Sequence, residues 1–93
     1  MGVEVVFTLR AERVLTDIVR DIAQDDEAAA FRLVLDLRRR VIETLKVFPD
    51  AGVTWHGGGR MMTIRRYAFV YRHDAAKGEV VVLDVFGPGM DWR

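Results

Sequence analysis

The 93-residue chain contains no cysteine, two prolines and only two histidines. Without cysteine it has neither a disulfide framework nor a thiolate zinc site. The histidines, His56 and His73, have no second pair of nitrogen ligands at metal spacing, and we expect no metal or other cofactor. No apolar run approaches the ~18 residues of a membrane span, and residues 1–9 lack the basic start of a signal peptide. We therefore expect a cytoplasmic protein with no membrane segment.

The chain also lacks net charge, since its fourteen basic residues balance fourteen acidic ones. Neutrality argues against strong non-specific binding of nucleic acid, which depends on the counterions that surplus cations release. The charge is unevenly spread: residues 1–27 hold three basic and seven acidic residues, whereas residues 28–93 hold eleven basic and seven acidic ones. Twelve of the basic residues are arginine, which forms bidentate contacts to carboxylates and phosphates. The composition therefore leaves room for a local basic patch.

Hydrophobic periodicity predicts one domain, residues 1–93, of class α+β in the order β-α-α-β-β-β. Thr8 is expected to cap the first helix, and Asp25-Asp26-Glu27 to begin the second. The last strand is the most apolar and is predicted to be the central one. We expect an antiparallel helical hairpin packed on a small antiparallel β-sheet that follows an N-terminal strand. The predicted elements are strands 3–9, 61–64, 67–73 and 79–86 and helices 11–24 and 27–48.

Arginines are concentrated in two segments. The run Arg38-Arg39-Arg40 lies on the second predicted helix, where consecutive side chains point in three directions and are not expected to form one patch. The segment 57–73, GGGRMMTIRRYAFVYRH, adds a glycine-rich loop and two arginine-bearing strands. Its glycines lack the Lys-Ser/Thr of a phosphate-binding P-loop and precede a strand, so we interpret them as a flexible loop.

The order of the short motifs resembles the RelE/ParE superfamily of bacterial toxins, the toxin halves of type II toxin–antitoxin modules, also labelled plasmid stabilisation proteins. The resemblance covers Val3 to Trp92. It implies a RelE/ParE-like fold and a cognate antitoxin that holds the toxin. The motifs are Phe48-Pro49-x-x-Gly52, Gly59-Arg60, Tyr67-x-x-x-Tyr71-Arg72 and Met90-Asp91-Trp92.

The resemblance implies two possible mechanisms. RelE-type toxins cut mRNA in the ribosomal A site, whereas ParE-type toxins inhibit growth by poisoning DNA gyrase. Many relatives carry a histidine and an arginine after the last strand, where this chain has Gly87 and Gly89. Glycine neither transfers a proton nor neutralises charge, so this departure favours a ParE-like toxin that binds its target and is not an enzyme. The alternatives are a ribosome-dependent mRNA endonuclease and a degenerate member that only binds antitoxin.

Candidate site residues follow from these readings. Arg60 either binds a partner or holds its loop by bonding carbonyl groups. Tyr67 and Tyr71 alternate with Phe69, so they are expected to be core or half-buried residues and not acid/base groups. Neither Trp92 nor the arginines can be assigned one role from sequence. For a nuclease the candidates are Arg60, Arg65, Tyr71, Arg72 and His73. For partner or target binding they are Arg60, Arg65, Arg66, Arg72 and Trp92.

Overall fold

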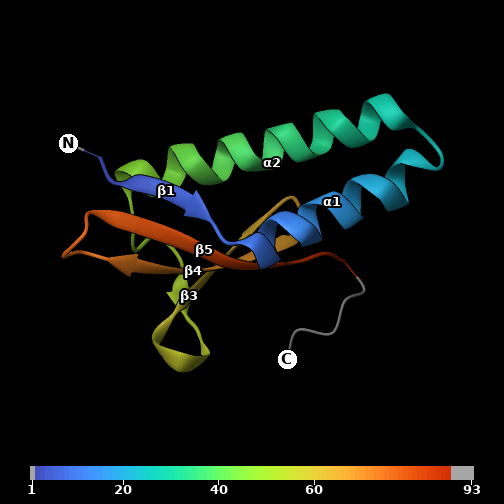
Figure 1. The fold of residues 1–93 in the computed structure, drawn as a ribbon. Helices are drawn as coiled ribbons and strands as arrows, with labels where there is room; N and C mark the ends of the chain where they lie inside the picture. The colour runs from blue at the N-terminus through green and yellow to red at the C-terminus, as the bar shows by residue number, and fades with distance from the viewer. Residues whose placement is uncertain (1, 89–93) are drawn as a thin grey trace.

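The computed structural model describes residues 2–88 and places two helices over one face of a five-stranded sheet (Figure 1). The motif Met90-Asp91-Trp92 and Gly89 lie outside the described residues. The predicted order of strands and helices is confirmed, with a short strand and a 3₁₀ turn added after the second helix. The elements are β1 (Glu4–Phe7), α1 (Leu9–Ala23), α2 (Glu27–Val47), β2 (Val53–Thr54), η1 (His56–Gly58), β3 (Arg60–Ile64), β4 (Tyr67–Asp74) and β5 (Glu79–Phe86).

The sheet has the strand order β1-β5-β4-β3-β2. The strands from β2 to β5 pair with one another in antiparallel fashion, as predicted, and β4 rather than β5 occupies the middle. β1 joins the edge parallel to β5, with Glu4 opposite Glu79 and Phe7 opposite Val82, which makes the sheet mixed. A parallel neighbour needs a long crossover, and here the helices and the other strands supply it.

Both helices begin at the caps that the sequence predicts. The Thr8 hydroxyl accepts a hydrogen bond from the Ala11 N–H at 3.1 Å, and the Asp26 carboxylate accepts one from the Ala29 N–H at 3.0 Å. Each such cap stabilises a helix by about 1 kcal/mol. Thr8 also bonds to β5 through its own N–H and hydroxyl, so it fixes where α1 starts relative to the sheet.

A β-bulge in β5 keeps Val80, Val82 and Val85 on the helix side. Val70 lies opposite Asp84, but Tyr71 lies opposite Val82, so Leu83 is the extra residue. The bulge shifts the alternation by one, and Val82 and Val85 both become fully buried. The carbonyl oxygen of Leu83 accepts the bond from the Thr8 hydroxyl at 3.0 Å.

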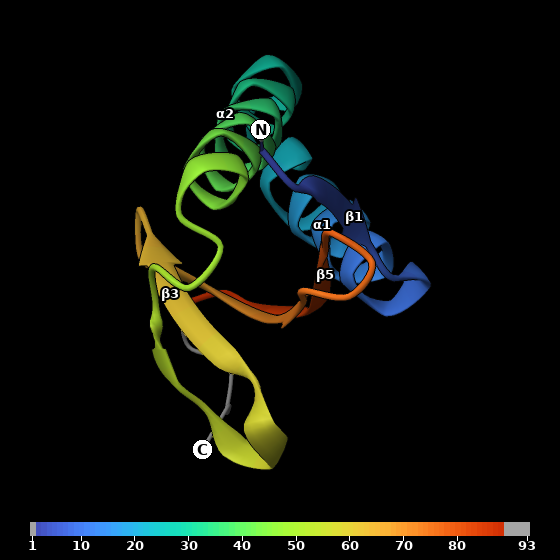
Figure 2. The same cartoon turned by 90° about the vertical axis from the view of Figure 1, so that its left-hand side faces the viewer.

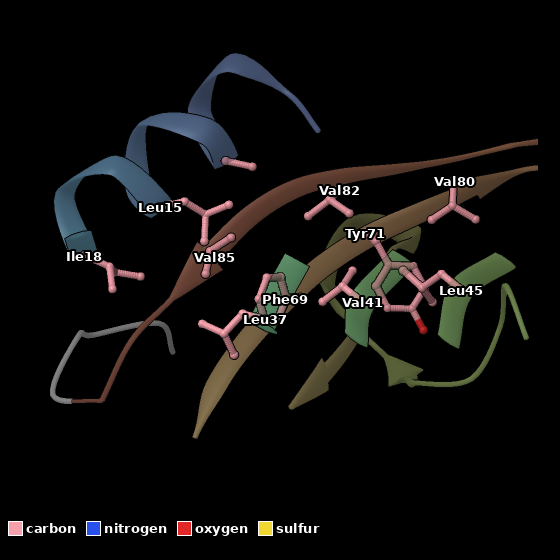
Figure 3. Close-up of a cluster of buried hydrophobic side chains, with 11 residues drawn as sticks. Leu15, Ile18, Leu37, Val41, Leu45, Phe69, Tyr71, Val80, Val82 and Val85 are labelled. Carbon is pink, nitrogen blue, oxygen red and sulfur yellow. The ribbon is translucent and has the colours of Figure 1, made fainter. Parts of the chain in front are cut away.

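The core lies between the helices and the sheet (Figure 3). Each helix contributes one stripe of buried side chains, and β4 and β5 contribute the side chains that face them. Replacing a fully buried leucine there with alanine costs about 2–5 kcal/mol. The buried side chains are Ala11, Leu15 and Ile18 from α1, Leu37, Val41 and Leu45 from α2, Phe69 and Tyr71 from β4, and Val80, Val82 and Val85 from β5.

The chain between α2 and β3 leaves the helices and returns as a hairpin. β2 pairs with the start of β3, and the turn between them extends away from the helices (Figure 2). Gly57 and Gly58 have φ angles of +70° and +83°, a left-handed conformation that glycine adopts without strain. The predicted glycine loop is thus a defined 3₁₀ turn in this structure.

Candidate functional site

Three of the five nuclease candidates meet where the loop after α2 crosses the end of the sheet. Arg60 and Tyr71 are direct partners across β3 and β4, so their side chains project to the same face. His73, two residues beyond Tyr71, lies on that face as well. The loop residue Asp50 contacts both Arg60 and His73, at 3.5 and 3.3 Å respectively. We call Asp50, Gly52, Arg60, Tyr71 and His73 the loop cluster.

Tyr71 is a buried anchor within the loop cluster. Its side chain is 0% exposed, and its hydroxyl oxygen accepts a hydrogen bond from the Gly52 N–H at 2.6 Å. Burial raises the pKa of Tyr71 above its usual value, while the Gly52 bond and the positive charge of Arg60 act in the opposite direction. The core position predicted for Tyr71 is confirmed. A buried, neutral phenol with a backbone partner is held in place and does not face a substrate.

Gly52 is required by this close approach. A Cβ atom at this position would lie 2.3 Å from the Met61 carbonyl oxygen and 2.7 Å from the Tyr71 hydroxyl. Only glycine therefore fits where the loop passes close to Met61 of β3 and Tyr71 of β4.

Arg60 holds the other side of the same loop. Its guanidinium donates to the carbonyl oxygens of Gly52 at 2.9 Å and Asp50 at 3.3 Å, and its Nε lies 3.5 Å from the Asp50 carboxylate. The carbonyl-bonding role, one of the two weighed from sequence, is the geometry observed. The side chain is 37% exposed, so part of it still faces solvent.

His73 is the member of the loop cluster best placed for chemistry. Its Nδ1 lies 3.3 Å from Oδ1 of Asp50, and its side chain is 21% exposed. A carboxylate beside one ring nitrogen fixes the tautomer and orientation of a histidine, as in catalytic base–orienter pairs. Asp50 itself is 58% exposed, which weakens its electrostatic effect on the ring.

The remaining predicted residues lie elsewhere. Arg65 and Arg66 form the turn between β3 and β4, at the opposite end of β3 from Arg60. Arg72 is exposed and alternates with Tyr71, so it projects from the other face of the sheet. Trp92 lies outside the described residues. The structure therefore brings Arg60, Tyr71 and His73 together but separates them from Arg65 and Arg72.

Sequence reasoning missed Asp50 and Gly52 as members of the site. Both follow the helix-ending Pro49 and read as ordinary turn residues. The signal that was available is the motif Phe48-Pro49-x-x-Gly52 itself, because a glycine at a fixed distance from the helix end indicates a close approach.

Within residues 2–88 no group of three or more histidine, aspartate or glutamate side chains is arranged to hold a metal ion. In the same part of the chain, neither helix combines the length and apolar character that crossing a membrane requires.

The sequence matches a known family of proteins. The model of the family described as "ParE toxin of type II toxin-antitoxin system, parDE" matches residues 5–92. The chain belongs to this family, within the RelE/ParE superfamily, and is a toxin of the type II toxin–antitoxin class.

Solved structures share the fold at low sequence identity. The chain is similar to a protein of the chromosomal ParDE system from P. aeruginosa, with a TM-score of 0.76, 19% identity and coverage of 90% of this chain and 94% of that one. It is similar to a chain of the RelBE2 toxin–antitoxin complex from Mycobacterium tuberculosis, with a TM-score of 0.71, 18% identity and coverage of 97% and 95%. For the intact E. coli RelBE complex the TM-score is 0.60, with 16% identity and coverage of 96% and 100%. No curated protein sequence matches the chain.

Proposed function

We propose that this toxin acts in the cytoplasm by binding a macromolecular target without cleaving it, and that a cognate antitoxin neutralises it. The observation that carries the proposal is that Arg60 and Tyr71 both hydrogen-bond to the loop after α2. The Tyr71 hydroxyl and the Arg60 guanidinium form hydrogen bonds of 2.6–3.3 Å with backbone groups of that loop. RNA cleavage needs a base, an acid and cations that converge on the reacting phosphate. After β5 the chain continues with Gly87, which supplies none of these groups.

DNA gyrase is the target that we propose, because it is the one that the resemblance implies for ParE-type toxins. Gyrase poisoning would inhibit growth. A toxin of this kind that is encoded on a plasmid would stabilise that plasmid. The antitoxin partner is supported by the solved relatives, which come from ParDE and RelBE systems.

The test compares two activities of the same purified protein. We expect the protein to inhibit gyrase-catalysed supercoiling. On translating ribosomes, we expect it to leave the mRNA intact. In cells, we expect DNA damage and filamentation before any fall in translation. Unimpaired growth on expression without the neighbouring antitoxin gene would contradict a toxic role and favour a member that only binds antitoxin.

One observation favours the mRNA endonuclease as the second candidate. His73 and Asp50 form a base–orienter pair at 3.3 Å, and the Arg60 guanidinium lies 3.5 Å from the same carboxylate. A nuclease built on this pair would use His73 for proton transfer and Arg60 to stabilise charge on the phosphate.

His73→Ala separates the two candidates. For a target-binding toxin we expect this variant to retain its inhibition of supercoiling, because the ion-pair partner that His73 loses, Asp50, is an exposed side chain. For an endonuclease the same change removes the proton-transfer group and lowers the cleavage rate by about 10²–10⁴-fold. Codon-specific cutting by the unmodified protein, lost in His73→Ala, would overturn the binding proposal.

A further inference from the structure

The sheet carries apolar side chains on both of its faces. One face packs against α1 and α2 and forms the core, and both helices lie on that side (Figure 2). We call the opposite side the open face. Alternation along each strand, with the bulge in β5, determines which residues point there. Its apolar residues are Val6 from β1, Val53 from β2, Met61 from β3, Val70 from β4, and Val81 and Phe86 from β5.

An apolar open face departs from the usual pattern of an antiparallel sheet. Such a sheet normally alternates apolar residues toward the core with polar residues toward water. The six apolar residues of the open face lie outside the core cluster, and Val53 is 62% exposed. Met61 has Val53 on one side and Val70 on the other, so the apolar side chains adjoin across the strands. Adjoining apolar residues on a solvent-facing side indicate an interaction surface.

One end of the open face carries a row of three carboxylates. Glu4 of β1 lies opposite Glu79 of β5, and Glu79 lies opposite Asp74 of β4. None of the three forms an ion pair with any other residue from 2 to 88. Like charges directly opposite each other destabilise a sheet. The row therefore opposes folding and leaves negative charge accessible to a partner.

Arginines gather on the helix side of the sheet instead. Arg39, Arg40 and Arg65 all pair with the Asp36 carboxylate of α2, at 2.7, 2.9 and 3.2 Å. Two members of the run 38–40 thus converge on one side chain from positions three and four residues away. This geometry corrects the expectation that the run forms no patch.

The charge of the open face makes a nucleic-acid backbone a poor fit. The strands place one guanidinium there, that of Arg72, against four carboxylates, those of Glu4, Asp74, Glu79 and Asp84. Arg10 of α1 neutralises one carboxylate through its 2.7 Å contact with Asp84. Binding to phosphates depends on a surplus of cations, which this face lacks. A protein surface with apolar side chains and lysine or arginine complements both of its features.

We propose that the toxin holds its target through the open face, and that the target presents a protein surface of apolar and basic side chains there. The inference rests on the proposed function, in which the toxin binds a macromolecule, and adds the class of that macromolecule and the surface used. The loop cluster lies on the other side of the sheet, because Arg60, Tyr71 and His73 point toward the helices. The two sites are therefore separate.

Two exposed valines provide a matched pair of variants. Val53 on the open face is 62% exposed, and Val47 at the end of α2 is 67% exposed. We expect Val53→Lys to raise the concentration that inhibits gyrase-catalysed supercoiling roughly tenfold, a loss of about 1.4 kcal/mol, because it places a charge in an apolar contact. Val47→Lys should inhibit as the unmodified protein does. Equal inhibition by the two variants would place the contact elsewhere.

Glu4→Gln/Glu79→Gln tests the carboxylate row. The variant removes like-charge repulsion, so it should be at least as stable as the unmodified protein, and weaker inhibition cannot come from misfolding. We expect inhibition to weaken roughly threefold at low salt, with a smaller difference as salt rises. Asp21→Asn/Asp25→Asn removes two exposed carboxylates from the helical hairpin and is the control. An equal loss in both double variants, or no loss in Glu4→Gln/Glu79→Gln, would overturn the role of the row.

Cysteine labelling identifies the occupant of the open face, because the chain has no cysteine of its own. Thr63→Cys places a thiol at an exposed position of the open face, and Thr16→Cys places one at an exposed position of α1. We expect saturating gyrase without DNA to slow maleimide labelling of Thr63→Cys at least roughly tenfold and to leave Thr16→Cys unchanged.

Other patterns of protection at Thr63→Cys would overturn the proposal. Protection by DNA alone would assign the face to nucleic acid, and protection by the antitoxin but not by gyrase would assign it to the antitoxin. Slow labelling of the isolated protein would assign it to a second copy if it depends on concentration. Slow labelling at every concentration would assign the face to the chain itself.

Growth arrest on expression separates this inference from the proposed function. If the unmodified protein inhibits gyrase and the open-face variants inhibit it equally well, the inference alone fails. If the unmodified protein arrests growth but spares gyrase, the proposed target is wrong, and loss of arrest in Val53→Lys but not in Val47→Lys would still support the open face. If the unmodified protein does not arrest growth, both the proposed function and the inference fail.

Discussion

The hydroxyl oxygen of Tyr71 accepts a hydrogen bond from the backbone N–H of Gly52 at 2.6 Å, across 19 residues of sequence. This bond joins the middle strand of the sheet to the loop that leaves α2. Arg60 holds the same loop through two carbonyl oxygens. The positions of Asp50 and His73 relative to each other therefore depend on side chains that act through backbone groups.

Tyr71→Phe tests this anchor. The change keeps the ring in the core but leaves the Gly52 N–H without its partner, and we expect a loss of about 1–3 kcal/mol in the free energy of unfolding. Urea denaturation followed by circular dichroism measures it. Tyr67→Phe, at a half-buried position on the same face, is the control and should change stability less. An equal loss in both variants would show that the bond to Gly52 contributes little.

The raised pKa of Tyr71 predicts a change at alkaline pH. A group whose pKa is higher in the folded than in the unfolded protein contributes stability fully below its unfolded value and loses that contribution as pH rises through the folded value. For a tyrosine the decline begins near pH 10. Unfolding measured across this range should show a steeper loss in the unmodified protein than in Tyr71→Phe. Parallel curves would contradict the role of burial.

Gly52→Ala should be more destabilising than an alanine at a glycine with open surroundings. The new Cβ would lie 2.3 Å from the Met61 carbonyl oxygen, a backbone atom that cannot move aside alone. We expect a cost of at least about 2 kcal/mol, typical of overpacking. Gly57→Ala is the matched control, since its φ of +70° is strained for alanine but nothing lies within 4 Å of the added atom. Thermal unfolding should rank Gly52→Ala as clearly less stable than Gly57→Ala.

Arg65→Asn/Arg66→Gly is expected to stabilise the protein by about 1 kcal/mol. The Asn-Gly sequence removes arginine from two left-handed backbone positions, each of which costs of order 1 kcal/mol. The ion pair between Arg65 and Asp36 that is lost is exposed and contributes only ~0.2–1 kcal/mol. Relief of strain should therefore outweigh the lost ion pair. Denaturant midpoints of this variant and of Arg65→Gln alone separate the two effects. A net loss in the double variant would mean that the ion pair is the larger effect.

Asp36 predicts how stability falls in acid. Burial alone would raise its pKa, but hydrogen bonds from Arg39 and Arg65 and the charge of Arg40 outweigh burial and lower the pKa from its usual 3.8. Its contribution is therefore present above that value and lost as pH falls through the lower folded value. Asp36→Asn should flatten the acid side of the stability curve below about pH 4. Asp25→Asn, at an exposed position, should keep the original pH dependence.

The sequence predicts most elements because their signals are local. The caps at Thr8 and Asp26 and the stripe along α2 depend on residues within a few positions of one another. The parallel pairing of β1 was not predicted, because nothing within residues 3–9 specifies a partner 75 residues away. The bulge at Leu83 was not predicted either, because a continuous run of apolar residues does not show which of them face the core.

The candidate site was predicted in part for the same reason. Arg60, Tyr71 and His73 belong to neighbouring strands, and alternation places them on one face once the hairpin is aligned. Their contacts to Asp50 and Gly52 depend on the path of a loop, which composition does not determine. The pairing of Arg65 with Asp36, 29 residues apart, likewise follows from how α2 crosses the sheet and cannot be read from either segment.

The parallel pairing of β1 with β5 has a consequence for synthesis. The edge strand β1 and Thr8, the cap of α1, bond to β5, which is translated about 75 residues later. A nascent chain can form its helical hairpin early but cannot complete the sheet until β5 has emerged from the exit tunnel. Such non-local closure is slow compared with helix formation. Until β5 is in place, the apolar faces of α1 and α2 lack part of the sheet that covers them in the folded protein, and a binding partner or a protease would have access to them.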